Sequence, residues 1–69
     1  MSDTNTSATA GAEFAEHAAR QQAAHYREQA AHFRSLAETE PLASLRHHLF
    51  GLARRQEELA ATVELQVRA

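Results

Sequence analysis

The chain contains no cysteine and no lysine, and it has one proline and two glycines. Without cysteine it can form neither a disulfide nor a thiolate zinc site. Because proline and glycine mark turns, their scarcity leaves few places where the chain can change direction. No apolar run approaches the roughly 20 residues of a transmembrane helix, and the first residues lack the basic and apolar regions of a signal peptide. We therefore expect a cytoplasmic protein built from a few long elements.

The size and charge of the chain narrow the function classes further. Its 69 residues allow one domain at most, and its formal net charge of -2 creates no general attraction for nucleic acid or an anionic membrane. A domain this small buries a limited fraction of its surface, so it commonly needs disulfides, a metal or oligomerisation for stability. With disulfides excluded, we expect self-association.

The distribution of helix-forming residues predicts two helices. Residues 1–11 are polar and small without an apolar period, which is typical of a disordered leader. Residues 12–38 are rich in Ala, Gln, Glu and Arg and contain no proline or glycine, so they should form a helix. Pro41 disfavours helical geometry at Glu40 but fits the first turn of a second helix, predicted over 41–67. The fold class is therefore all-α, an antiparallel two-helix hairpin forming a single domain over 12–69.

An apolar heptad in the second helix predicts the contact between the two helices. Its positions alternate in steps of three and four residues: Leu42, Leu45, Leu49, Leu52, Gln56, Leu59, Val63 and Gln66. On the first helix the matching stripe is Ala15, Ala19, Gln22, Tyr26, Ala30, Phe33 and Ala37. Gly51 lies away from this contact and indicates either a modest bend or the close approach of another backbone.

A second apolar stripe beside the heptad predicts an interface with a partner. Phe14, Ala18 and Leu36 lie on the first helix, and Phe50, Ala53 and Ala60 on the second. Two helices cover only one side of each other, and the two alanines should leave room for another helix. We expect either two copies paired into a four-helix bundle or docking as an accessory subunit on a larger protein complex.

Two weaker constellations give the alternative functions. His25, Glu28 and His32 share an edge of the first helix, but the histidines are about 10 Å apart along the axis and cannot chelate one ion alone. We therefore expect no metal and no cofactor. If these histidines meet at a subunit contact, a pH-sensing bundle would weaken as the pH falls through about 6.5.

The other constellation is the basic segment of Arg46, Arg54 and Arg55, with His47 and His48, which could contact phosphates in a nucleic-acid-associated regulator. The acidic chain and the absence of a reading head argue against it. Catalysis is not expected either, since there is no cysteine nucleophile, no glycine-rich phosphate loop and no Ser-His-Asp set. The sequence favours a non-enzymatic interaction or scaffold protein.

Two strings resemble short helical proteins of alphaproteobacteria whose function is unknown. Tyr26-Arg27-x-x-Ala30 continues to Arg34-x-Leu36-Ala37-Glu38, and Leu49-x-x-Leu52-Ala53 continues to Glu57-x-Leu59-Ala60. In those proteins a YR-x-x-A-x-x-x-R-x-LAE helix precedes an LA-x-x-YE-x-LA helix. This chain has Gln56 where a tyrosine is usual. The resemblance covers about residues 26–64, implies a helical hairpin and carries no known activity.

Overall fold

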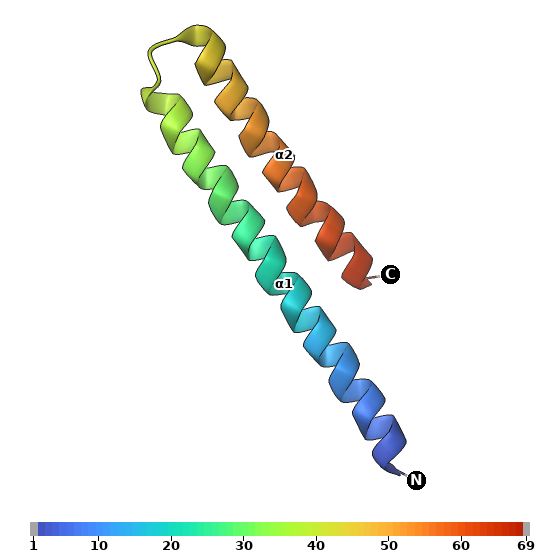
Figure 1. The fold of residues 1–69 in the computed structure, drawn as a ribbon. Helices are drawn as coiled ribbons and strands as arrows, with labels where there is room; N and C mark the ends of the chain where they lie inside the picture. Colours follow the sequence, from blue (N-terminus) through green and yellow to red (C-terminus); the bar gives the residue numbers. More distant parts are fainter. Residues whose placement is uncertain (1, 69) are drawn as a thin grey trace.

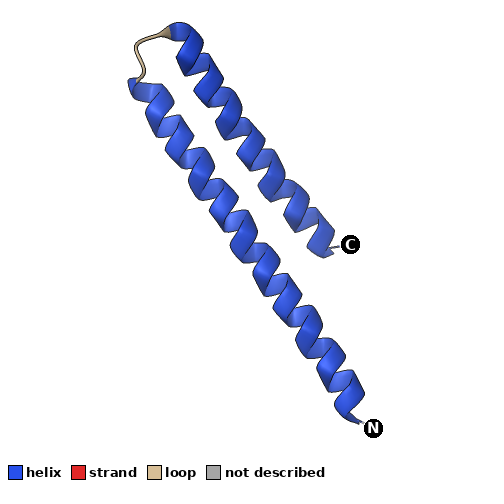
Figure 2. Cartoon of the chain, viewed as in Figure 1, coloured by secondary structure: helices blue, strands red, loops and turns tan. Residues whose placement is uncertain are grey.

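The molecule is a pair of long helices packed side by side. The computed structural model describes the backbone of residues 2–68 and the side chains of residues 11–67. Helix α1 (Ser2–Thr39) is followed by helix α2 (Ala43–Arg68), which runs back along it (Figure 1). The described residues contain no strand (Figure 2). The predicted all-α pair of packed helices is confirmed.

Both helices begin at a different residue from the one predicted. Helix α1 begins at Ser2, within the segment expected to be an unstructured leader, and its first turns extend past the end of α2 (Figure 1). Once a helix has nucleated, each further residue adds a hydrogen bond, and no proline interrupts the segment. With 38 residues in α1 and 26 in α2, the two helices are unequal in length.

The connection consists of Glu40, Pro41 and Leu42, so α2 begins two residues later than predicted. The Glu40 carboxylate accepts a hydrogen bond from the Leu42 N–H at 3.2 Å. The Leu42 carbonyl then accepts from the Arg46 N–H at 2.9 Å, which is a helical four-residue step. The Arg46 guanidinium donates back to the Glu40 carbonyl at 3.4 Å. Glu40 thus caps the start of α2 and leaves Pro41 outside the helix.

The core between the helices is made of alanine. Among the residues whose side chains are described, five apolar residues are buried, and all are alanines: Ala23, Ala30, Ala37, Ala53 and Ala60. No larger side chain is fully buried. Small side chains at a helix contact allow the axes to approach to the short end of the usual 8–10 Å range. The larger apolar side chains therefore lie along the edges of the contact.

The predicted contact stripes are displaced from those in the structure. On α2, Ala53 and Ala60 occupy the centre, while Leu42 and Leu45 are 63% and 41% exposed. The rest of the heptad from 49 to 63 is half-buried beside the alanines, and Gln66 is exposed. On α1, Ala30 and Ala37 of the predicted stripe are buried, whereas Gln22 is exposed and the adjacent Ala23, which the prediction left out, is buried. The central row of α2 was predicted wrongly because the leucines were placed at the contact, whereas the smaller alanines allow the closest approach.

Gly51 lies on the exposed outer side of α2. An added Cβ there would meet nothing within 4 Å. Of the two interpretations of this glycine, close approach by another part of the described chain is therefore excluded.

Candidate interaction surface

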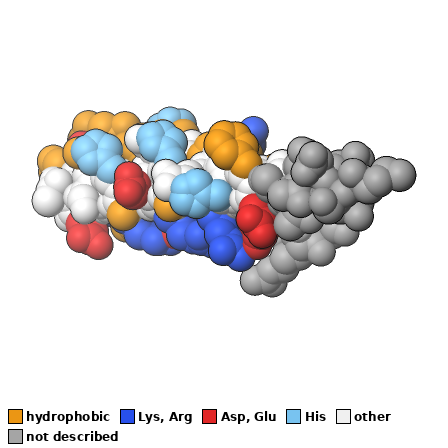
Figure 3. Space-filling model, turned by 90° about the horizontal axis from the view of Figure 1, so that it is seen from below, with side chains coloured by type: hydrophobic (Ala, Val, Ile, Leu, Met, Phe, Trp, Pro, Cys, Tyr) orange, Lys and Arg blue, Asp and Glu red, His pale blue; other side chains and the backbone are white. Residues whose placement is uncertain are grey.

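Ion pairs between the helices define one long side of the hairpin. Arg27 pairs with Glu64, and Arg34 pairs with Glu57. The two arginines are seven residues apart, as are the two glutamates, so the pairs repeat every two turns along an antiparallel contact. We call these four residues the ionic face. Figure 3 shows basic side chains in a row along one edge of the molecule, with histidines beside them.

The arginines of α1 differ in whether they pair within the helix or across to α2. Arg20 pairs with Glu16 on α1 at 2.5 Å, as its four-residue spacing predicts. Arg34, by contrast, reaches across to Glu57 instead of pairing along α1 with Glu38. A hydrogen bond from Arg27 to Glu64, together with the negative charge of this glutamate, raises the pKa of Arg27. These cross-helix pairs occur in the register in which the alanines meet.

The larger apolar side chains lie on the opposite side of the contact from the ion pairs. Taking Ala30 as the centre of the α1 contact, Phe33 lies about 60° to one side and Arg34 about 40° to the other at roughly 100° per residue. On α2, Val63 and Glu64 have the same relation to Ala60. We define the apolar face by its larger side chains: Tyr26, Phe33, Leu36, Leu45, Leu52, Leu59 and Val63.

The apolar face is free of charge over most of its length. On α1, positions 15, 22, 29 and 36 are occupied by Ala, Gln, Gln and Leu. On α2, positions 45, 52, 59 and 66 are occupied by Leu, Leu, Leu and Gln. Within this face, the Gln22 amide donates to the Tyr26 hydroxyl at 3.4 Å. Leu36 is 43% exposed, and the aromatic rings of Tyr26 and Phe33 are only half-buried. An uncharged, half-open apolar surface is typical of a helix-binding site.

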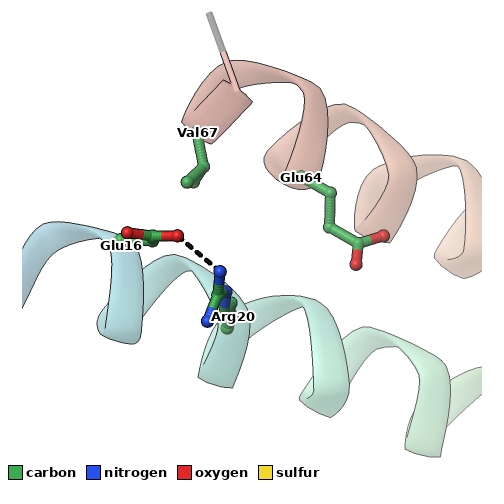
Figure 4. A pocket seen from close by; sticks show the side chains of 4 residues that line it. All are labelled: Glu16, Arg20, Glu64 and Val67. Atoms are coloured by element: carbon green, nitrogen blue, oxygen red, sulfur yellow. Dashed lines mark hydrogen bonds and ion pairs between the residues drawn. The ribbon is translucent and has the colours of Figure 1, made fainter. Parts of the chain in front are cut away.

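An open groove of about 460 Å³ continues the apolar face where α2 ends against α1. Its lining is mostly small or apolar: Ala12, Ala15, Glu16, Ala19, Gln22, Val63, Gln66 and Val67. On its ionic side, a smaller hollow of about 140 Å³ is lined by Glu16, Arg20, Glu64 and Val67 (Figure 4). Figure 4 shows Glu16 and Arg20 joined on α1, with Glu64 and Val67 on α2. Both carboxylates of this hollow already have a basic partner: Glu16 pairs with Arg20, and Glu64 pairs with Arg27.

The residues predicted as a partner interface do not form one surface. Phe14, Ala18, Leu36 and Phe50 are exposed, but the buried Ala53 and Ala60 contact the other helix and cannot meet a partner. Their assignment to the interface was wrong, since they form the centre of the hairpin. Phe50 precedes Glu57 by seven residues and so lies on the ionic side of α2. Phe14 is nine residues before Ala23, which places it on the outer side of α1.

The polar constellations are dispersed over the outside of the hairpin. His25, Glu28 and His32 are exposed on α1, and the described residues include no group of three or more His, Cys, Asp or Glu side chains arranged to hold a metal. Arg46, Arg54 and Arg55 are also exposed. Arg46 and Arg55 are nine residues apart, and so lie on opposite sides of α2. The basic segment therefore does not form a single basic face.

A sequence repeat that marks the contact was missed. Residues 22–28 read QAAHYRE and residues 29–35 read QAAHFRS, so an alanine, an aromatic ring and an arginine recur seven residues apart. On α2, an alanine followed four residues later by a glutamate occurs at residues 53 and 60. These repeats identify the alanine rows, with arginine on one helix matched by glutamate on the other.

Comparison with known protein families, with curated proteins and with solved structures found no match. The resemblance to alphaproteobacterial hairpin proteins stays a prediction. Within the described residues, neither helix is long and apolar enough to cross a membrane.

Proposed function

We propose that this protein is a non-enzymatic helical assembly module whose apolar face pairs with that of a second copy to form a four-helix bundle. The observation that supports this most directly is the alanine core. Every fully buried apolar residue of the described side chains is an alanine, while seven of the larger apolar side chains lie half-open or exposed on the apolar face. A second hairpin laid on this face would cover them.

The energetics of burial favour pairing over an isolated hairpin. Complete burial of a Leu or Phe side chain stabilises a fold by about 1.5–3 kcal/mol, several times the contribution of an alanine methyl group. The isolated hairpin buries none of its leucines or phenylalanines completely. The face contains seven larger apolar residues, which is enough for the core of a small bundle.

The charge distribution also supports this pairing. The ion pairs that hold the two helices together lie on the ionic face, so a partner on the apolar face disrupts none of them. Glutamines at positions 22, 29, 56 and 66 lie on the face, and His48, five turns before Gln66 on α2, lies at its edge. Amides can hydrogen-bond across a helix interface without the desolvation cost of a buried charge.

The test compares one substitution at two exposed leucines. Leu36→Asp places a carboxylate on the apolar face, whereas Leu65→Asp places it on an exposed part of α2 that follows Glu64. Sedimentation equilibrium should give an oligomer for the unmodified protein and for Leu65→Asp. Leu36→Asp should be a monomer with reduced helicity by circular dichroism. An unmodified protein that is a fully helical monomer at micromolar concentration would contradict the proposal.

A further inference from the structure

We infer that the two copies pair in opposite directions, so that the loop end of each hairpin covers the groove of the other and the two-fold axis passes near Gln29. This inference rests on the proposed self-association. It concerns the direction and register of the pairing, which the proposed function does not specify.

The two ends of the apolar face differ in side-chain size. At the loop end, Leu36, Leu42 and Leu45 are all more than 40% exposed. At the other end, the groove of about 460 Å³ is lined chiefly by alanines on α1 and by Val63 and Val67 on α2. Opposite pairing sets these large side chains over the open groove. Pairing with both loops at the same end would place leucine against leucine and leave both grooves open.

The unequal helix lengths favour the same direction. Helix α1 extends past the end of α2 (Figure 1), so in this region it has no neighbour within its own hairpin. If both loops lie at one end, the shorter helices of both copies stop at the same level, and this part of α1 stays uncovered. If the copies run in opposite directions, the loop end of the partner reaches the groove and covers α1 from about Ala12 onward.

The position of Gln29 fixes the register. It is half-buried on the apolar side of α1, midway between Ala19 in the groove and Thr39 at the end of the helix. A two-fold axis at this level brings the Gln29 side chains of the two copies together and places Tyr26 of one near Phe33 of the other. A polar residue at the centre of an apolar interface is a known means of fixing register, and in this register the two Gln29 amides can hydrogen-bond to each other.

Cysteine cross-linking tests the direction directly, because the chain has no cysteine of its own. Three single variants are placed on the apolar side: Ala15→Cys in the groove, Gln29→Cys at the centre and Leu45→Cys at the loop end. Ala31→Cys, exposed and beyond the ionic face on α1, is the control. Each variant is first checked to have the same oligomer mass and helicity as the unmodified protein. A short bis-maleimide is then added.

Opposite pairing predicts a distinctive pattern. Gln29→Cys should cross-link with itself, and Ala31→Cys should not. Ala15→Cys and Leu45→Cys should each cross-link poorly alone but give several-fold more covalent dimer when the two proteins are mixed and allowed to exchange subunits. Self-cross-linking of Ala15→Cys and of Leu45→Cys, with no gain on mixing, would overturn the inference while leaving the proposed bundle intact.

The remaining outcomes separate the two proposals. If the protein is a dimer by sedimentation but cross-links through Ala31→Cys and not through Gln29→Cys, the apolar face is not the interface. That outcome would overturn both the proposed interface and the inferred direction. A protein that stays monomeric in sedimentation would overturn the proposed function, and the inference with it.

Discussion

Alanine determines the hairpin contact through its size. Among the described side chains, five alanines are the buried apolar residues, and most positions next to them in the helical rows carry larger or charged side chains. Where two helices meet, a methyl group lets the backbones approach closely, so that many weak dispersion contacts form along the row. A larger residue at the same place would push the helices apart over several turns.

Ala60→Leu tests this size requirement. It should lower the free energy of unfolding by about 1–3 kcal/mol, because the added carbons have no space between the helices. The matched control is Ala61→Leu, on the exposed neighbouring position, which should have little effect. Urea denaturation followed by circular dichroism measures both. If Ala60→Leu is as stable as Ala61→Leu, the helices are not closely packed at this level.

At the scale of the helices, the sequence was sufficient to predict the two elements and the break between them. Pro41 is the one proline, and helix-forming residues occupy both sides of it. The contact itself was harder to predict, because the leucine heptad and the alanine rows lie next to each other on α2. Periodicity alone does not choose between neighbouring rows. The choice depends on the closeness of approach and on pairs such as Arg27 with Glu64, which join residues far apart in the chain.

The candidate interaction surface could be predicted only in part for the same reason. Leu36 is exposed beside the helix contact, and its role in an interface stays a prediction. Phe50 was assigned to the same surface because both are apolar residues outside the heptad. Once Ala53 is known to be the centre of the α2 contact, Phe50 falls on the ionic side instead. A shift of one row was enough to move residues from one face to the other.

The charge pattern makes a prediction about helix register. Arg27→Glu opposes Glu64 with a like charge and should lower the melting temperature at low salt, and the double variant Arg27→Glu with Glu64→Arg should recover much of the loss. Because both side chains are partly exposed, the effect should fade as salt screens the charges. Thermal melts at low and high salt measure it. Equal losses in the single and double variants would show that the pair does not select the register.

Salt is a better variable than pH for this pair. Glu64 raises the pKa of Arg27, so the contribution of the guanidinium is fully present below its unfolded-state pKa. On the side of the guanidinium, that contribution would be lost as the pH rises through the raised value, which lies far above neutral pH.

The whole molecule is a thin rod with principal extents of 63 by 17 by 10 Å. A single layer of two helices offers shallow grooves along its length, and seven of its larger apolar residues share the apolar face. Such a shape is suited to binding another helical layer.

Truncation tests how far along the rod the partner extends. If the loop end of the second copy covers α1 from about Ala12 onward, deleting residues 1–11 should leave the dimer dissociation constant nearly unchanged. Deleting residues 1–19 also removes Ala12, Ala15 and Ala19 from the wall of the groove. This deletion should weaken the dimer by about tenfold or more, because the partner loses its contacts with this wall. A tenfold change corresponds to about 1.4 kcal/mol of association free energy. Sedimentation equilibrium on the two truncated proteins gives the comparison. Equal dissociation constants for both would place the partner away from the groove, and a loss already complete on removing residues 1–11 would place its main contact on the first turns of α1.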